Sequence, residues 1–215
     1  MQEMSKKRSK DRVLENAAEL IKEGFRCYER GNKLGAEKKL RAACAIRPPV
    51  PQAHYNLGVF YNLEERWDEA EKALLKALEH QPDYSRALFT LASVYMEGGR
   101  LDRAQTKFLA TERLTPDDLD IQLNLGIIAI RTGRSEEAFD RLDRCIAAEH
   151  SSDTARFHRA TALQDLGRLD EALLLYRALI AENSKWRQPI LNAIVTRPKG
   201  QFPLSQSKLA EMLGL

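Results

Sequence analysis

The stretch NLGVFYNLEERWDEAEKALLKALEHQP, residues 56–82, decides the fold of this 215-residue chain, because its spacing of small and large apolar residues recurs along the sequence. A related stretch, TLASVYMEGGRLDRAQTKFLATERLTP, occupies residues 90–116, which is 34 residues further on. A fixed period of this length indicates a repeat architecture, in which each unit buries its apolar surface against its neighbours.

Five segments of 34 residues follow one another without insertion when the pattern is extended outward. Their eighth residue is always glycine or alanine, and their twentieth is always alanine. Two antiparallel helices that cross closely need small residues at the crossing. The segments are 17–50, 51–84, 85–118, 119–152 and 153–186; the eighth residues are Gly24, Gly58, Ala92, Gly126 and Ala160, and the twentieth are Ala36, Ala70, Ala104, Ala138 and Ala172.

Other positions predict two helices and a turn in each segment. Large side chains at the seventh, eleventh and twenty-fourth positions are expected to fill the space around the crossing. Glycine at the fifteenth position suits a left-handed helix end, aspartate at the eighteenth is expected to cap the second helix, and proline at the thirty-second ends that helix. These residues are Gly31, Gly99, Gly133 and Gly167; Asp68, Asp102 and Asp170; and Pro48, Pro82 and Pro116.

The pattern resembles the tetratricopeptide repeat, whose spacing of small and aromatic residues is that of residues 56–82 and 90–116. The resemblance implies an all-α fold, a right-handed superhelical solenoid of antiparallel helix pairs over residues 17–186. Residues 1–16 are expected to form a basic arm, frayed at Lys6 to Lys10, and the start of the first helix. Residues 187–215 are expected to form one or two capping helices, because the last repeat otherwise exposes an apolar flank.

The expected capping helices have two apolar stripes, separated by the loop from Pro198 to Pro203. Ile190, Leu191, Ile194 and Val195 make the first, and Leu209, Met212 and Leu213 make the second.

The net charge of +3 is too small to require a nucleic-acid or membrane partner. Its distribution is uneven, with a charge of about +6 on residues 1–50, about −7 on residues 51–182 and about +4 on the remaining tail. An acidic middle flanked by basic ends leaves open a self-assembling scaffold, in which the basic end of one copy docks on the acidic middle of another.

Cysteine usage and hydropathy favour a cytoplasmic protein. The three cysteines, Cys27, Cys44 and Cys145, are odd in number and widely spaced, which favours a reducing compartment over a disulfide framework. We expect them to be small core residues. No apolar run of signal-peptide length follows the basic N-terminus, and no stretch of about 18 apolar residues predicts a transmembrane segment.

Catalytic patterns are missing from the sequence. The four histidines, His54, His80, His150 and His158, have no metal-ligand spacing, and there is no phosphate-binding glycine loop or nucleophile elbow. The cysteines have no neighbours in the sequence that would lower their pKa. We therefore expect a protein that is not an enzyme and that needs no cofactor and no metal.

In tetratricopeptide arrays the first helix of each repeat lines the concave wall, so the resemblance implies where a ligand binds. The fifth and ninth positions give a mainly apolar stripe, and the sixth gives side chains that can hydrogen-bond an extended peptide. The alternative is that Phe89 and Phe157 pack between adjacent first helices. The expected peptide-binding residues are Tyr55, Asn56, Val59, Arg86, Phe89, Thr90, Leu123, Asn124, Ile127, Phe157 and His158.

Family members that bind chaperones hold a C-terminal carboxylate with a set of lysine, asparagine and arginine residues on three consecutive repeats. No window of three repeats in this chain supplies the cationic set, although Arg86 with Asn56 leaves a partial anion site. The sequence thus favours a scaffold or adaptor for a protein or peptide ligand. Nucleic-acid binding is least favoured, because the concave wall lacks a lysine and arginine lining and the array is net acidic.

Overall fold

The computed structural model describes residues 2–147, 152–196 and 213, and these residues form helices and connecting turns with no strand among them. They divide into two compact units, Met1–Pro116 and Asp117–Leu215, which we call the N-terminal and C-terminal units. The all-α fold class expected from the sequence is confirmed.

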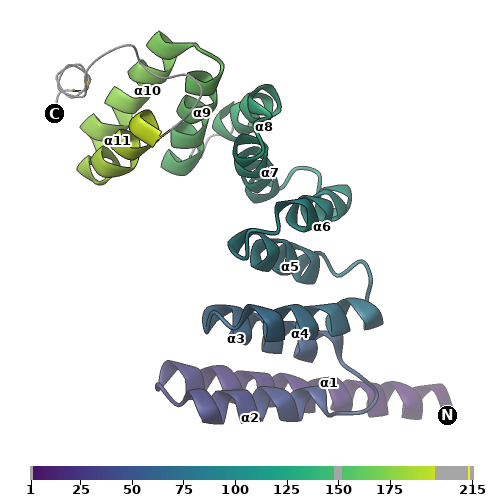
Figure 1. The fold of residues 1–215 in the computed structure, drawn as a ribbon. Helices are drawn as coiled ribbons and strands as arrows, with labels where there is room; N and C mark the ends of the chain where they lie inside the picture. The colour runs from purple at the N-terminus through teal and green to yellow at the C-terminus, as the bar shows by residue number, and fades with distance from the viewer. Residues whose placement is uncertain (1, 148–151, 197–212, 214–215) are drawn as a thin grey trace. The chain divides into compact units, whose positions relative to one another are not determined.

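The N-terminal unit consists of three antiparallel helix pairs stacked in chain order (Figure 1). First helices of neighbouring pairs contact each other, α1 with α3 and α3 with α5, and each second helix packs on the next first helix. The first helices thus form one continuous wall. The pairs are α1 (Gln2–Glu29) with α2 (Lys33–Cys44), α3 (Pro51–Leu63) with α4 (Trp67–His80), and α5 (Ser85–Glu97) with α6 (Leu101–Leu114).

The C-terminal unit has two further pairs, with a contact between α7 and α9, and then a cap. Ile190 and Ile194 of α11 and the isolated Leu213 are buried in the same apolar cluster as Tyr176 and Leu179. The first expected capping helix is therefore present, while Leu209 and Met212 of the second lie outside the described residues. The elements are α7 (Leu119–Arg131), α8 (Ser135–Ala147), α9 (Asp153–Asp165), α10 (Leu169–Glu182), the 3-10 helix η1 (Ser184–Trp186) and α11 (Arg187–Thr196).

The two helices of a pair cross where the eighth and twenty-fourth residues of a repeat meet. A β-carbon added at Gly58 would lie 2.6 Å from the γ-carbon of Leu74, which is closer than nonbonded carbon atoms approach. A β-carbon added at Gly24 would lie 2.9 Å from the γ-carbon of Leu40, and one added at Gly126 would lie 2.9 Å from the γ-carbon of Leu142. A side chain larger than that of glycine would therefore have to displace the leucine at the twenty-fourth position in these three repeats.

Alanine replaces glycine at the eighth position in the two repeats whose twenty-fourth residue is aromatic. Ala92 goes with Phe108, and Ala160 goes with Tyr176. All four residues are fully buried. Leucine branches at its γ-carbon and fills the space over the crossing, whereas a flat ring leaves room for one methyl group. The residue sizes at the two positions are thus matched.

The turn inside each pair has the same hydrogen bond in all five repeats, from the backbone N–H of the sixteenth residue to the carbonyl of the eleventh. This closure places the fifteenth residue in the left-handed region. Gly31, Gly99, Gly133 and Gly167 have φ between 71° and 77°, as the sequence predicts. In the second repeat the residue is Glu65, with φ of 57°, so this turn carries backbone strain.

Two local predictions were wrong. The second helices begin at the seventeenth residue, so Asp68, Asp102 and Asp170 lie inside the first turn and do not cap it; there they interact favourably with the helix dipole. The basic arm is not frayed, because α1 begins at Gln2 and includes Lys6 to Lys10. Lysine, arginine and glutamate are good helix formers, which suits a helix over this segment.

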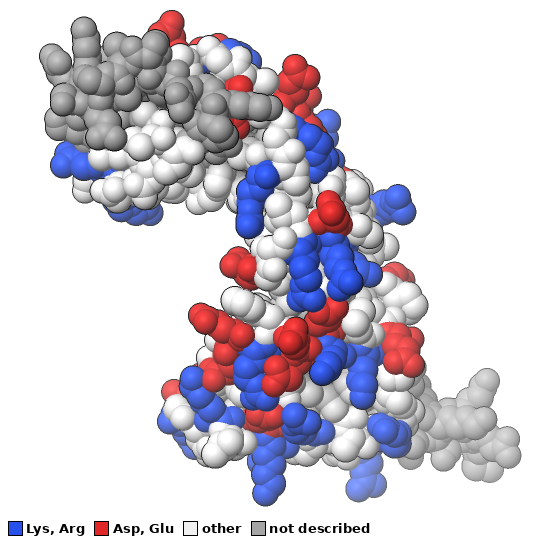
Figure 2. Space-filling model, in the orientation of Figure 1, with Lys and Arg blue, Asp and Glu red and all other residues white. Residues whose placement is uncertain are grey.

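A carboxylate of one repeat binds an arginine and a tyrosine of the next in the N-terminal unit. Glu37 accepts hydrogen bonds from Arg66 at 2.7 Å and from the Tyr61 hydroxyl at 2.9 Å. Glu71 binds Arg100 and Tyr95 in the same way, at 2.5 and 2.8 Å. Figure 2 shows positive and negative side chains intermixed on the visible face of this unit.

The hydrogen bond from Arg66 holds the pKa of Glu37 at about 2, against an ordinary value of 4.5, although burial acts in the opposite direction. Hydrogen bonds from Arg41 and Tyr61 add to the lowering. A carboxyl whose pKa is lower in the folded protein stabilises it fully above the unfolded value. This contribution is lost as the pH falls from about 4.5 through about 2.

We predict that Glu37→Gln lowers the free energy of unfolding at neutral pH by about 1 to 3 kcal/mol, because charge-assisted hydrogen bonds are replaced by weaker ones. The difference from the wild type should shrink as the pH approaches 2. Urea unfolding at several pH values measures it, with the exposed Glu97→Gln as control. A difference that does not depend on pH would contradict the assignment.

We also predict that Gly58→Ala destabilises the protein by about 1 to 2 kcal/mol, because the added methyl overlaps Leu74. Leu74→Phe should restore stability in the Gly58→Ala background, giving a coupling energy of about 1 kcal/mol or more in a double-mutant cycle. If instead Gly58→Ala raises stability, as it would at an uncrowded helix position, the matching of the two positions is wrong.

The strained turn gives a third prediction. Glu65→Gly should stabilise the protein by about 0.5 to 1 kcal/mol, since glycine adopts the left-handed conformation without the clash of a β-carbon. The reverse change, Gly99→Ala, serves as the matched control and should destabilise by a similar amount. Thermal unfolding of the two variants measures whether each change raises or lowers stability.

Candidate functional site

The structure places the eleven expected peptide-binding residues on first helices of both units. In the N-terminal unit they lie on α3 and α5, which contact each other, and in the C-terminal unit on α7 and α9, which also do. Arg86 is exposed and the other ten side chains are partly buried. They are Tyr55, Asn56 and Val59; Arg86, Phe89 and Thr90; Leu123, Asn124 and Ile127; and Phe157 and His158.

The polar side chains at the sixth position are bound to their own helix. The Asn56 side-chain amide donates to the carbonyl of Gln52 at 2.7 Å, and Asn124 donates to the carbonyl of Asp120 at the same distance. An amide has two N–H donors and an oxygen acceptor, so this bond uses one donor and orients the rest of the group. The Thr90 hydroxyl donates its one proton to the backbone carbonyl of Arg86 at 2.9 Å, so toward a ligand it can act only as an acceptor.

The two phenylalanines contact aromatic residues of their own repeats. Phe89 meets Phe108 of α6 edge to face, with ring centroids 5.3 Å apart. Phe157 stacks on Trp186 at 5.2 Å and lies 6.2 Å from Tyr176 of α10. Both rings therefore contribute to the core as well as to the surface of the first helices.

Tyr84 and Trp186 were missed in the sequence and belong to this surface. Tyr84 lies 5.2 Å from Tyr55, between ring centroids, and burial raises its pKa, so it is a neutral phenol at physiological pH. The indole N–H of Trp186 donates to Asp153 at 3.1 Å. Both aromatic residues occupy the last position of a 34-residue segment, and this shared position was the signal that could have found them.

The described residues hold no group of three or more His, Cys, Asp or Glu side chains placed to bind a metal ion. Cys145 is buried as expected, whereas Cys27 and Cys44 are only partly buried. Burial raises the pKa of Cys44 to about 11 and also raises that of Cys145, so these thiols are protonated at neutral pH. Protonated thiols are poor nucleophiles.

No helix in the described part of the chain is long and apolar enough to cross a membrane.

Three tetratricopeptide repeat models match the sequence, at residues 51–84, 89–148 and 154–178. Together they cover more than half of the chain, and they fall on the helix pairs described above. The chain belongs to the tetratricopeptide repeat family. The resemblance drawn from residues 56–82 and 90–116 is thereby confirmed.

Among curated proteins, the chain is 26% identical over 139 residues to anaphase-promoting complex subunit 3 of Schizosaccharomyces pombe (strain 972 / ATCC 24843), across 65% of this chain and 21% of that protein. The chain thus spans about a fifth of the length of this relative.

Two solved structures illustrate the shared fold. A tetratricopeptide repeat protein from Parabacteroides merdae ATCC 43184 has a TM-score of 0.74 and 21% identity, over 93% of this chain and 74% of that one. MamA, residues 41 to the end, from Desulfovibrio magneticus RS-1 has a TM-score of 0.71 and 15% identity, over 79% and 96%. At these identities the likeness shows the fold alone.

Proposed function

We propose that this tetratricopeptide repeat protein is a non-catalytic scaffold or adaptor that binds an extended peptide or a helix of a partner protein on its first helices. The observation that carries the proposal is the orientation of Asn56 and Asn124. Each amide is held by its own helix and keeps a donor and an acceptor for a ligand backbone.

The spacing of neighbouring first helices supports an extended ligand. Packed helices lie about 8 to 10 Å apart, which is the length of about three residues of extended chain. A backbone that binds Asn56 on α3 can therefore meet Thr90 on α5 three residues later, and its N–H groups suit the acceptor that Thr90 provides. Partly buried Tyr55, Val59 and Phe89 offer apolar surface for its side chains.

The C-terminal unit offers a similar surface. Asn124 supplies the amide, Leu123 and Ile127 supply apolar surface on the same helix, and His158 adds an imidazole on α9.

Arg86 on the N-terminal unit is exposed and would attract an acidic side chain of the ligand. We propose that each unit uses its own first helices in this way.

The test places a photo-crosslinking amino acid at position 56 and, as control, at exposed Arg113 of α6. We predict that position 56 crosslinks a partner in the native cell and that position 113 does not. Purified partner should then bind Asn56→Ala more weakly by about 0.5 to 1.5 kcal/mol, the value of one hydrogen bond, with little change in stability.

Crosslinking from position 113 alone, or unchanged affinity of both Asn56→Ala and Asn124→Ala, would contradict the proposal. A crosslink to a second copy of this chain would support self-assembly instead.

A further inference from the structure

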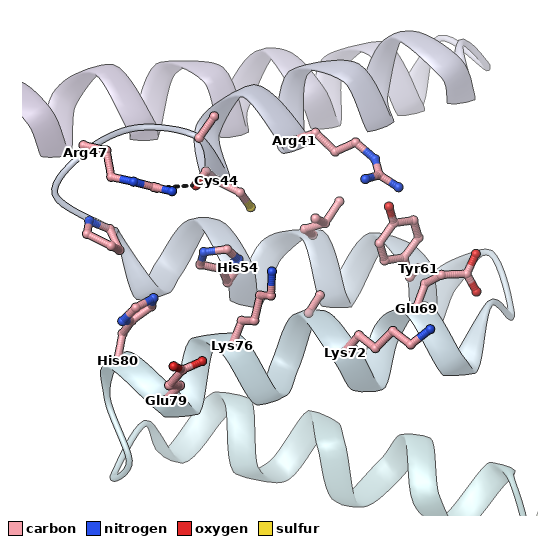
Figure 3. Close-up of a pocket in the computed structure, with 14 residues that line it drawn as sticks. Arg41, Cys44, Arg47, His54, Tyr61, Glu69, Lys72, Lys76, Glu79 and His80 are labelled. Carbon is pink, nitrogen blue, oxygen red and sulfur yellow. Dashed lines mark hydrogen bonds between the residues drawn. The ribbon is translucent and has the colours of Figure 1, made fainter.

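A groove of about 580 Å³ opens between the second helices α2 and α4 of the N-terminal unit. Its floor is α3, which packs against both and holds them apart. Figure 3 shows that α3 presents His54 and Tyr61 to this groove. Tyr55, Asn56 and Val59 do not line it, so the groove is distinct from the proposed peptide surface on the first helices.

Positive charge predominates in the groove. Lys72 and Lys76 project into it from successive turns of α4, while Arg41 and Arg47 approach from the side of α2 (Figure 3). The two carboxylates among its described lining residues are Glu69 and Glu79, and the first of these is held by Arg66 outside the groove, at 2.9 Å.

The partners of the four cations differ. Arg41 donates to Glu37 at 2.9 Å, and Arg47 donates to backbone carbonyls of Cys44 and Ile46 at 3.3 and 3.1 Å. Neither Lys72 nor Lys76 has an ion-pair partner within the described residues. The two lysine ammonium groups are therefore available to an anionic ligand.

Two histidines stand at one end of the groove, beside Arg47 and Lys76 (Figure 3). The rings of His54 and His80 have centroids 5.8 Å apart. Burial lowers the pKa of His54, and electrostatic interaction with nearby His80, Lys76 and Arg47 lowers it further, while Glu79 raises it. An anion in the groove would offset this repulsion between like charges.

The repeat itself does not require this set of residues. At the next junction of the same unit, between α4 and α6 over α5, the positions equivalent to the cations and histidines of the groove carry no positive charge, whereas Arg103 and Arg113 occupy the positions of Glu69 and Glu79. The residues 34 positions further on are Leu88 in place of His54, Thr106 in place of Lys72, Ala110 in place of Lys76, Leu114 in place of His80 and Gln81 in place of Arg47. Both junctions fold as helix pairs on a shared first helix, so packing of the repeats does not require these cations.

We propose that the groove between α2 and α4 binds an extended acidic segment of a partner protein, with carboxylates at alternate positions on Lys72 and Lys76. Four residues of helix advance about 6 Å, and two residues of extended chain advance about 6.6 Å, so the two spacings match. Alternate side chains of an extended chain also point the same way. The proposal is independent of the one made for the first helices.

The groove also suits the uncharged parts of such a ligand. Leu57 and Tyr61 of α3 and Ala73 of α4 line the groove and provide apolar surface for the stems of glutamate side chains. The histidines can donate hydrogen bonds to a third carboxylate at the end near Arg47. The groove thus combines an apolar floor with charged rims, as peptide sites commonly do.

The probe is the fluorescent heptapeptide Gly-Glu-Ser-Glu-Ser-Glu-Gly, measured by anisotropy at low salt with the full chain. Lys72→Gln and Lys76→Gln should each weaken its binding about tenfold, the effect of losing one charge-assisted hydrogen bond. Lys38→Gln is the matched control, because Lys38 occupies on α2 the position of Lys72 on α4 and is exposed outside the groove. It should change binding less than about twofold.

Further readouts separate the outcomes. The peptide should shift the imidazole NMR signals of His54 and His80. The analogue with glutamine in place of each glutamate should not bind. The Asn56→Ala variant should bind the peptide as the wild type does, even if the proposed function is wrong. No binding and no imidazole shift up to about 1 mM peptide would overturn the proposal. So would equal weakening by Lys38→Gln, or a single-stranded oligodeoxynucleotide that binds the lysines more tightly than the peptide does.

Discussion

Every helix pair in this protein depends on one close approach, between the eighth residue of a repeat and the twenty-fourth. Where the twenty-fourth residue is leucine, as at Leu74, a β-carbon on the residue opposite would overlap the leucine side chain unless that side chain moved. The turn that follows is closed by the same backbone hydrogen bond in each repeat. The crossing and the turn together hold the second helix against the first, so all other contacts of the repeat follow from them.

Contacts between repeats are less uniform than contacts within them. In the N-terminal unit, Glu37 and Glu71 each bind an arginine and a tyrosine of the next repeat. In the C-terminal unit the equivalent residue is Phe139, and Arg168 lies over its ring at 4.8 Å. The arginine at the sixteenth position is thus held by a carboxylate in one unit and by a cation–π contact in the other.

Stacking of this kind gives the N-terminal unit two kinds of surface. The first helices contact one another and present amides and partly buried apolar side chains, whereas α2 and α4 are separated by α3 and border a groove. The side-chain amide on the first helices suits an uncharged peptide backbone. The cationic groove suits acidic side chains. The two proposed sites would therefore bind two segments of partner proteins without competition between them.

The sequence by itself determined the repeat length, the helix pairs, the close crossings and the left-handed turns, because these depend on residues close in the chain and recur at a fixed period. Only the tertiary structure decided that Phe89 packs on Phe108 and Phe157 on Trp186, and that Asn56 is bound to its own helix. It also decided that Lys72, Lys76, His54 and His80 line one groove with Arg47. Such groupings join residues of different helices, and they follow from side-chain directions and helix packing that no single period in the sequence specifies.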